Sequence, residues 1–198
     1  MQRNVLEYLE ETVKRVPDKI AFANDKTQLT FQQFSDDIRA IGSELIRKGY
    51  QKEPVLIYMN KSPEALEGFF GVIESGCFYV PLDEEMPKRR IELIIENTKA
   101  RVIICDQENL KRVKELPFDG EIMLHEELAK KREDKEKLDK VRRTALDTDP
   151  LYVLFTSGST GMPKGVVGHH RGVIDYIDQL SAVLDFDCLL YTSDAADE

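Results

Sequence analysis

Cysteine is scarce in this sequence. The three that occur, Cys77, Cys105 and Cys188, form no CxxC pair and show no spacing typical of metal ligands. This pattern argues against a zinc module and favours reduced thiols, so we expect no metal-ligating residues and a cytoplasmic protein. The sequence also has no run of 18 apolar residues, and its first residues lack the apolar stretch of a signal peptide. We therefore expect no membrane partner.

Positive charge is also in short supply. The sequence has 28 Lys and Arg against 37 Asp and Glu, which gives a formal net charge of -9. A general nucleic-acid binder carries a basic surface, so we expect no nucleic-acid partner. Apolar residues make up 41% of the 198 residues, an ordinary fraction that allows a sizeable core. The length fits one large domain or part of one.

Strand-like and helix-like segments alternate along the chain. Short β-branched and aromatic runs predict strands at 20–23, 55–59, 77–80, 101–106 and 122–124. Apolar residues at helical spacing predict helices at 4–15, between Thr30 and Gly49, between Ser62 and Gly76, and from Pro87 onward. The succession strand, helix, strand, helix, strand predicts an α/β fold with a parallel sheet.

Several residues mark where these elements begin and end. Thr30 is followed by Gln33 three residues later, the pattern of a capping box. Ser62 precedes a proline, which suits an N-cap and a first helical residue. Gly49 and Gly76 are placed to end their helices. The strand at 77–80 is expected to stop at Pro81.

The segment from Lys130 to Arg143 is dense in charges of both signs and holds only two aliphatic residues. Two interpretations fit this composition. The favoured one is an exposed helix or mobile connector in which opposite charges pair along the surface. The other is an arm that docks a partner.

A small polar loop interrupts the apolar pattern late in the chain. Leu151 to Phe155 predicts a buried strand before it, Val166 and Val167 resume the apolar character after it, and Val173 to Leu184 predicts a helix. Glycines allow backbone N–H groups to turn toward an anion, hydroxyls donate further hydrogen bonds, and a lysine adds charge. The sequence therefore predicts a phosphate-binding loop made of Thr156, Ser157, Gly158, Ser159, Thr160, Gly161, Lys164 and Gly165.

Two generic nucleotide-binding motifs fit this loop poorly. Walker A requires glycine directly before the lysine and Ser or Thr directly after it, whereas Pro163 and Gly165 flank Lys164. This disfavours a P-loop NTPase. No GxGxxG follows the first strand, so a dinucleotide-binding domain has no support either.

The string from Tyr152 to Val166, YVLFTSGSTGMPKGV, resembles at nearly every position the signature loop of the adenylate-forming (AMP-binding) enzymes. That superfamily includes acyl-CoA synthetases, luciferases and the adenylation domains of nonribosomal peptide synthetases. The block from Gly71 to Asp83, GVIESGCFYVPLD, is similar to one of the amino-acid-activating branch, and Leu29 to Phe34 and Ala100 to Asp106 fit the family's order. The branch includes peptide synthetase adenylation domains and D-alanine–carrier-protein ligases. The resemblance covers residues 3–187.

The resemblance implies the fold and its extent. The expected fold is α/β, the N-terminal portion of the large two-sheet (αβαβα) domain of these enzymes, truncated soon after the loop. Residues 1–187 would be a partial AMP-binding (adenylation) domain. Residues 188–198, CLLYTSDAADE, resemble a translated sequencing adaptor and are expected to be a non-native tail. The chain alone is expected to be inactive.

The resemblance also implies an activity. Enzymes of this family attack the α-phosphate of ATP with a substrate carboxylate, release pyrophosphate, and pass the acyl group to a thiol. It implies an amino acid or other small carboxylic acid as substrate, ATP with Mg²⁺, and a carrier-protein phosphopantetheine arm or CoA as acceptor. Thr156 to Gly161 and Gly165 would hold phosphates, and Lys164 would be catalytic by stabilising charge on the leaving pyrophosphate. An acyl-CoA synthetase fragment and a non-catalytic nucleotide or carrier-protein binding module stay open as alternatives.

Three histidines and one aspartate are further candidates for a role in or near the site. His169 or His170, of which His170 better matches a histidine that often follows the loop in the family, is expected to cap the next helix or line the acyl pocket. Asp83 is expected to be a turn or cap carboxylate. His125 is expected on the surface.

Overall fold

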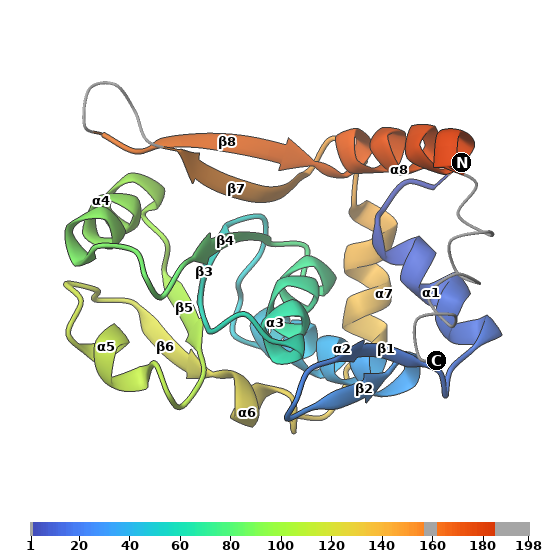
Figure 1. The fold of residues 1–198 in the computed structure, drawn as a ribbon, viewed down its shortest axis with the longest axis horizontal. Coiled ribbons are helices and arrows are strands. Elements are labelled where there is room, and N and C mark those ends of the chain that lie inside the picture. The colour runs from blue at the N-terminus through green and yellow to red at the C-terminus, as the bar shows by residue number, and fades with distance from the viewer. Residues whose placement is uncertain (1, 157–161, 185–198) are drawn as a thin grey trace.

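The chain folds into helices packed around a six-stranded sheet, with a separate two-stranded ribbon (Figure 1). The computed structural model describes residues 2–156 and 162–184. The helices are α1 (Leu6–Arg15), α2 (Phe31–Arg47), α3 (Pro63–Glu74), α4 (Lys88–Thr98), α5 (Leu110–Lys114), α6 (His125–Leu128), α7 (Lys135–Thr144) and α8 (His170–Leu184). The strands are β1 (Ile20–Ala23), β2 (Gln28–Thr30), β3 (Pro54–Tyr58), β4 (Phe78–Leu82), β5 (Val102–Cys105), β6 (Glu121–Leu124), β7 (Pro150–Thr156) and β8 (Lys164–His169).

The six-stranded sheet has the order β6-β5-β3-β4-β7-β8. Its first five strands are parallel, with pairs β3–β4, β3–β5, β4–β7 and β5–β6. This confirms the predicted α/β fold with a parallel sheet. β8 then adds to β7 as an antiparallel strand. The sequence pattern did not predict β8 as a strand, although an antiparallel strand at the edge of a parallel sheet is a common arrangement.

The central strands are buried on both faces. Val55 and Ile57 of β3 pack with residues of α2, α3 and α6. Leu56 and Tyr58 of the same strand pack with residues of α4 and α5, because successive side chains point to opposite faces. Two helical layers therefore cover the sheet. This explains why β5 is a continuous apolar run with all four residues buried.

The predicted helix boundaries are confirmed at the caps. Thr30 Oγ1 accepts a hydrogen bond from the Gln33 N–H, while the Thr30 N–H donates to Gln33 Oε1, which completes the capping box. Ser62 Oγ accepts a hydrogen bond from the N–H of Ala65, the third residue of α3. Gly49 and Gly76 have φ values of 85° and 76°, a conformation that favours glycine after a helix.

The prediction that a strand stops at Pro81 is wrong, since β4 continues to Leu82 and Pro81 is registered with Ile57 of β3. The pairing of β4 with β7, its neighbour on the side away from β3, explains why proline is tolerated. In the described residues, β7 pairs with β4 at a single register position, Tyr79 with Tyr152. Beyond that position the strand has an open edge, where a residue without an N–H loses no ladder hydrogen bond.

The charged segment contains helix α7, which confirms the exposed-helix interpretation, and it also contacts the body of the protein. Leu138 is buried, and the Asp134 N–H donates to Ser43 Oγ of α2 at 2.8 Å. The Arg39 guanidinium of α2 binds Glu133, with Nε 3.0 Å from Oε1. The helix is therefore anchored to α2 at its start.

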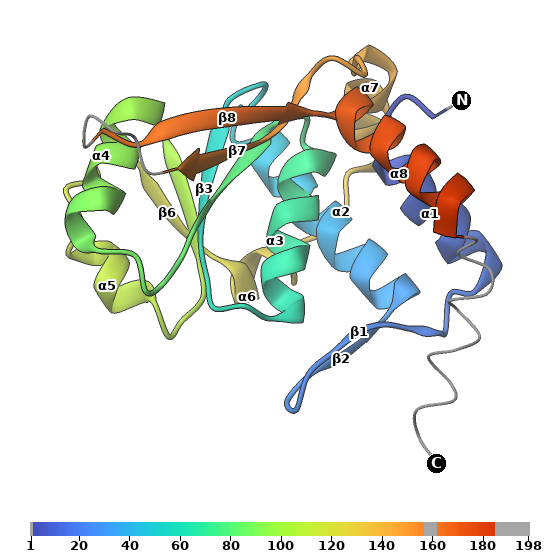
Figure 2. The same cartoon turned by 45° about the horizontal axis from the view of Figure 1, so that its top comes forward.

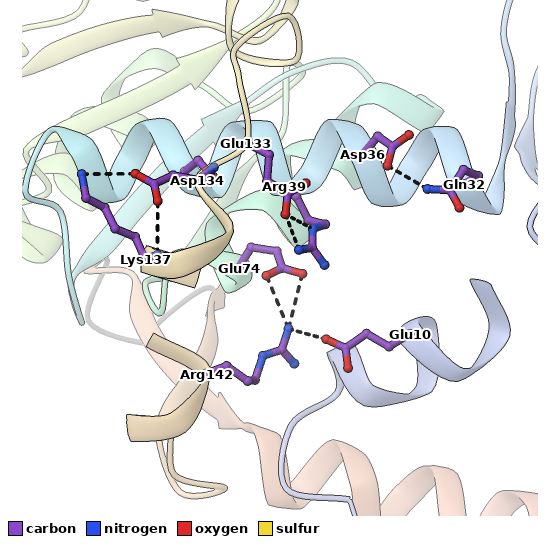
Figure 3. Close-up of polar contacts among 10 residues, drawn as sticks. Glu10, Gln32, Asp36, Arg39, Glu74, Glu133, Asp134, Lys137 and Arg142 are labelled. Atoms are coloured by element: carbon purple, nitrogen blue, oxygen red, sulfur yellow. Dashed lines mark hydrogen bonds and ion pairs between the residues drawn. The ribbon is translucent and has the colours of Figure 1, made fainter. Parts of the chain in front are cut away.

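A second anchor lies near the end of α7. Arg142 lies between Glu74 of α3 and Glu10 of α1, with N–O distances of 3.4 Å and 3.0 Å (Figure 3). The Glu74 carboxylate is buried, and burial raises its pKa while the nearby Arg142 and Arg39 lower it. Arg142 thus joins three helices through one guanidinium.

The β7–β8 hairpin crosses the molecule, as both views show (Figures 1 and 2). At one end, Leu151 of β7 and Ile174 of α8 are buried with Leu6 of α1 and Phe34 of α2. At the other end, where β7 finishes and β8 begins, Phe155 packs against the apolar cluster that includes the isoleucines of α4. The hairpin is therefore held at both ends by helices.

Candidate functional site

The predicted phosphate loop is bracketed by the two strands of this hairpin. Thr156 is the last residue of β7 and Lys164 the first of β8, and the two are register partners. Phe155 and Gly165 form the next pair. Ser157, Gly158, Ser159, Thr160 and Gly161 lie outside the described residues. The structure thus brings together the described members of the predicted site at one end of the hairpin.

Thr156 and Lys164 are both exposed at this end. The Thr156 hydroxyl donates to the backbone oxygen of Lys164 at 3.4 Å. Within the described residues, the Lys164 ammonium enters no ion pair. An exposed lysine and an exposed threonine on paired residues, at the carboxyl end of a strand parallel to its neighbour, are chemically suited to bind an anion.

Gly165 has a packing role that the sequence did not reveal. A Cβ atom on Gly165 would lie 2.8 Å from Val153 Cγ1 and 3.2 Å from the ring of Phe155. Both residues lie on β7. Glycine at this position therefore allows the two strands to approach closely beside the loop.

A cavity of about 510 Å³ lies at the carboxyl ends of β3 and β4. Leu66, Phe69, Leu82 and Met86 contribute apolar walls, and Asp83 lies at its rim. The helix after β3 covers one face of the sheet and the helix after β4 covers the other, the arrangement that opens a crevice at strand ends. The sequence did not predict this cavity, because its wall residues belong to apolar segments whose pattern predicts only packing in the core.

Asp83 is a turn carboxylate, as predicted. Its Oδ1 accepts a hydrogen bond from the Glu85 N–H at 2.8 Å, and Oδ2 lies 3.4 Å from Lys61 Nζ. The hydrogen bond from the Glu85 backbone lowers the pKa of Asp83, so the carboxylate stays charged at neutral pH. These contacts account for Asp83 without a catalytic role.

The two histidines after the loop have different structural roles. His169 Nδ1 accepts a hydrogen bond from the Gly172 N–H at 3.3 Å, which confirms the predicted cap at the start of α8. His170 is buried, and its Nδ1 accepts from the Val5 N–H at 3.3 Å. Burial lowers the pKa of His170 to about 4. His170 is therefore a neutral acceptor that joins α8 to the start of α1.

The prediction that His125 lies on the surface is wrong. His125 is buried, and its Nε2 lies 2.8 Å from Oε2 of Glu67 in α3, a carboxylate with only 2% of its side chain exposed. Asp37 of α2 lies near this pair, and burial followed by the Glu67 charge raises the pKa of Asp37 to about 7. A lone histidine in a polar stretch gave no sign of this cluster, because its partners come from helices distant in the sequence.

The described residues hold neither a metal cluster nor a membrane-spanning helix. Among them, no group of three or more His, Cys, Asp or Glu side chains is arranged to hold a metal ion. No helix in the described ranges is long and apolar enough to cross a membrane. Cys77 and Cys105 are buried free thiols.

Comparison of sequences finds relatives among peptide synthetases. The chain is 33% identical over 175 residues to gramicidin S synthase 2 of Brevibacillus brevis, and the match covers 88% of this chain and 4% of that protein. It is 30% identical over 172 residues to gramicidin S synthase 1 of the same organism, with coverage of 86% and 15%. The chain therefore spans only a small part of the length of these relatives.

Comparison of structures finds the same fold in larger proteins. The chain matches the nonribosomal peptide synthetase FmoA3 bound to α-methyl-L-serine-AMP, with a TM-score of 0.79, 23% identity, and coverage of 91% of this chain and 20% of that one. It also matches VinN, with a TM-score of 0.77, 20% identity and coverage of 93% and 51%. These matches confirm the α/β fold and show that it forms a portion of larger solved proteins.

The family itself is settled by a family model described as AMP-binding enzyme, which matches residues 9–194. That match covers most of the chain, including the described strands of the hairpin and the block that ends at Asp83. The resemblance seen in the loop sequence is thus confirmed over the whole fold. This chain belongs to the AMP-binding enzyme family.

Proposed function

We propose that the protein carrying this chain is an adenylate-forming ligase that activates a carboxylic acid with ATP. The acid would become an acyl-adenylate with release of pyrophosphate, and the acyl group would pass to a thiol. The observation that carries the proposal is the hairpin end, where Thr156 and Lys164 are paired and exposed in a chain of the AMP-binding family. Since the chain spans a small part of its relatives, the activity is proposed for the full-length protein.

Charge is the central difficulty of this reaction. A carboxylate and a triphosphate are both anions, so the enzyme must neutralise charge and align the two groups. We assign phosphate binding to Thr156, to residues 157–161 and to Gly165 through hydroxyl and N–H donors. Lys164 would stabilise the charge that grows on pyrophosphate as it leaves. Its exposed ammonium has no competing ion pair in the described residues, which supports this assignment.

An amino acid is the favoured substrate, and a carrier-protein thiol the favoured acceptor. The names of the matched relatives support this choice, because they are peptide synthetases such as gramicidin S synthase 2. The FmoA3 structure holds an amino-acyl adenylate, α-methyl-L-serine-AMP, and a VinN structure holds L-aspartate. CoA as acceptor is the alternative.

Mg²⁺ would accompany ATP as its counterion. The described residues offer no cluster of carboxylates for a resident ion, so we assign no step of the reaction to a protein-bound metal. The ion would supply charge neutralisation on the phosphates. The cytoplasm, where ATP is available and thiols stay reduced, is the proposed location, consistent with the free thiols of Cys77 and Cys105.

ATP–pyrophosphate exchange tests this function. The full-length protein is incubated with ATP, labelled pyrophosphate and single acids from a panel of amino acids, aryl acids and fatty acids. We expect exchange that depends on one or a few amino acids. Exchange with fatty acids alone would favour an acyl-CoA synthetase. Binding of ATP without exchange for any acid would instead indicate a non-catalytic binding module and contradict the proposal.

A further inference from the structure

Arg90 connects α4 to the end of the hairpin that bears the phosphate loop. It lies in the first turn of α4, and its Nη2 donates a hydrogen bond to the backbone oxygen of Phe155 at 2.9 Å, across 65 residues of sequence. Phe155 is the residue before Thr156 and is the register partner of Gly165. The guanidinium therefore contacts the backbone one residue before the loop begins.

The sheet itself supports this end of the hairpin weakly. In the described residues, β7 is paired with β4 at Tyr152 alone, whereas its pairing with β8 continues to Thr156. The last residues of β7 thus lie beyond the parallel ladder. Two further contacts support this end: the packing of Phe155 against the apolar cluster that includes the isoleucines of α4, and the hydrogen bond from Arg90 of α4.

We propose that Arg90 is a positioning residue for the adenylation reaction, which fixes the end of β7 and thereby the Thr156–Lys164 pair that faces the triphosphate. This inference rests on the proposed function. Preorganised donors act only when their backbone is held in place, so a loose hairpin end would misalign hydroxyl and N–H donors together. Arg90 acts through the Phe155 carbonyl, and no contact with ATP is assigned to it.

The test compares Arg90→Ala, Arg90→Lys and Arg89→Ala in the full-length protein. Arg89 is a matched control, because it is the neighbouring residue of α4, is exposed and pairs with Glu92 within the helix.

Removing a hydrogen bond whose donor is charged changes an equilibrium constant by about tenfold or more. We expect Arg90→Ala to lower kcat/KM for ATP in pyrophosphate exchange by about tenfold, with the KM for the amino acid unchanged. Arg90→Lys, which keeps a charged donor, should recover part of the loss, and Arg89→Ala should match the wild type.

Hydrogen–deuterium exchange supplies a readout that does not depend on activity. Peptides covering 150–156 and 164–169 should take up deuterium about tenfold faster in Arg90→Ala, while peptides of β3 and β5 should not change. Equal uptake in the wild type and all three variants, or faster uptake over the whole sheet with no recovery by lysine, would overturn the proposal. If the wild type shows no pyrophosphate exchange, the proposed function fails, and the deuterium measurement still decides whether Arg90 holds the hairpin.

Discussion

His170 is a single buried side chain whose protonation is linked to folding. Its Nδ1 accepts the Val5 N–H, and burial lowers its pKa from 6.5 to about 4. In the unfolded chain the imidazole takes up a proton near its ordinary pKa, so the stability contributed by this neutral group is present above pH 6.5. This stability is lost as the pH falls from 6.5 to about 4.

This linkage gives a prediction for His170→Gln, which has no titrating group. Between pH 7 and pH 4.5 the wild type should lose about 2 kcal/mol of unfolding free energy relative to the variant. Urea unfolding of both proteins at several pH values measures the difference. Parallel curves for the two proteins would show that His170 is not buried in the neutral form.

Asp37 gives a pH dependence of the opposite sign. Its pKa is raised from 3.8 to about 7 by burial and by Glu67, so the folded state holds the proton more tightly than the unfolded state. The resulting stability is fully present below pH 3.8 and is lost as the pH rises to about 7. Asp37→Asn copies the protonated side chain and does not titrate.

Thermal melting of wild type and Asp37→Asn between pH 4 and 8 tests this assignment. We expect the wild type to become progressively less stable than the variant as the pH rises, with no further change above about pH 7. A difference that is constant over the whole range would mean that Asp37 keeps an ordinary pKa. The surrounding His125 lowers the pKa of Asp37, so His125→Gln should enlarge the effect.

At the level of elements, α2 and α3 are in close contact through two glycines. A Cβ on Gly71 of α3 would lie 2.5 Å from Ile41 Cγ2 of α2, and one on Gly42 of α2 would lie 2.6 Å from Glu74 Cβ of α3. Such distances require a shift of backbone, since Ile41 is fully buried. The glycines therefore set how closely these helices approach.

Gly71→Ala should destabilise the fold by about 1–2 kcal/mol, because overpacking outweighs the gain of up to about 1 kcal/mol in helix propensity. Gly68→Ala in the same helix is the control. Its Cβ would meet nothing closer than 3.5 Å, at Met59 Sδ, so this change should be neutral or slightly stabilising. Urea unfolding compares the two. Equal effects of both substitutions would contradict a tight contact between α2 and α3.

Local signals predicted most elements correctly. The capping box of Thr30, the cap of Ser62 and the glycines at positions 49 and 76 depend on neighbouring residues alone, and each was confirmed. β8 was missed because its sequence, KGVVGH, is short and polar at both ends, and Val166 and Val167 are exposed. An edge strand of this kind forms because it pairs with its neighbour, here β7, and its own sequence carries no alternating apolar pattern that would predict it.

At the level of the whole molecule, long-range packing decided what the sequence could not show. His125 and His170 are buried by partners on other helices, and Val5 is 165 residues from His170. Pro81 is tolerated because its strand has an open edge. The candidate site was predictable to a greater extent, since its members are contiguous in sequence. The Arg90 contact and the packing of Gly165 required the tertiary structure.

The hairpin end that presents Lys164 to a leaving pyrophosphate is the centre of the proposed function. The most direct measurement is ATP–pyrophosphate exchange by the full-length protein with Lys164→Ala, and with Lys14→Ala as a remote exposed lysine control. Loss of one preorganised donor costs on the order of 3 kcal/mol in the transition state. We therefore predict that Lys164→Ala slows exchange by about 100-fold with little change in acid binding, and that Lys14→Ala exchanges like the wild type. Exchange by Lys164→Ala at the wild-type rate would contradict the role of this lysine.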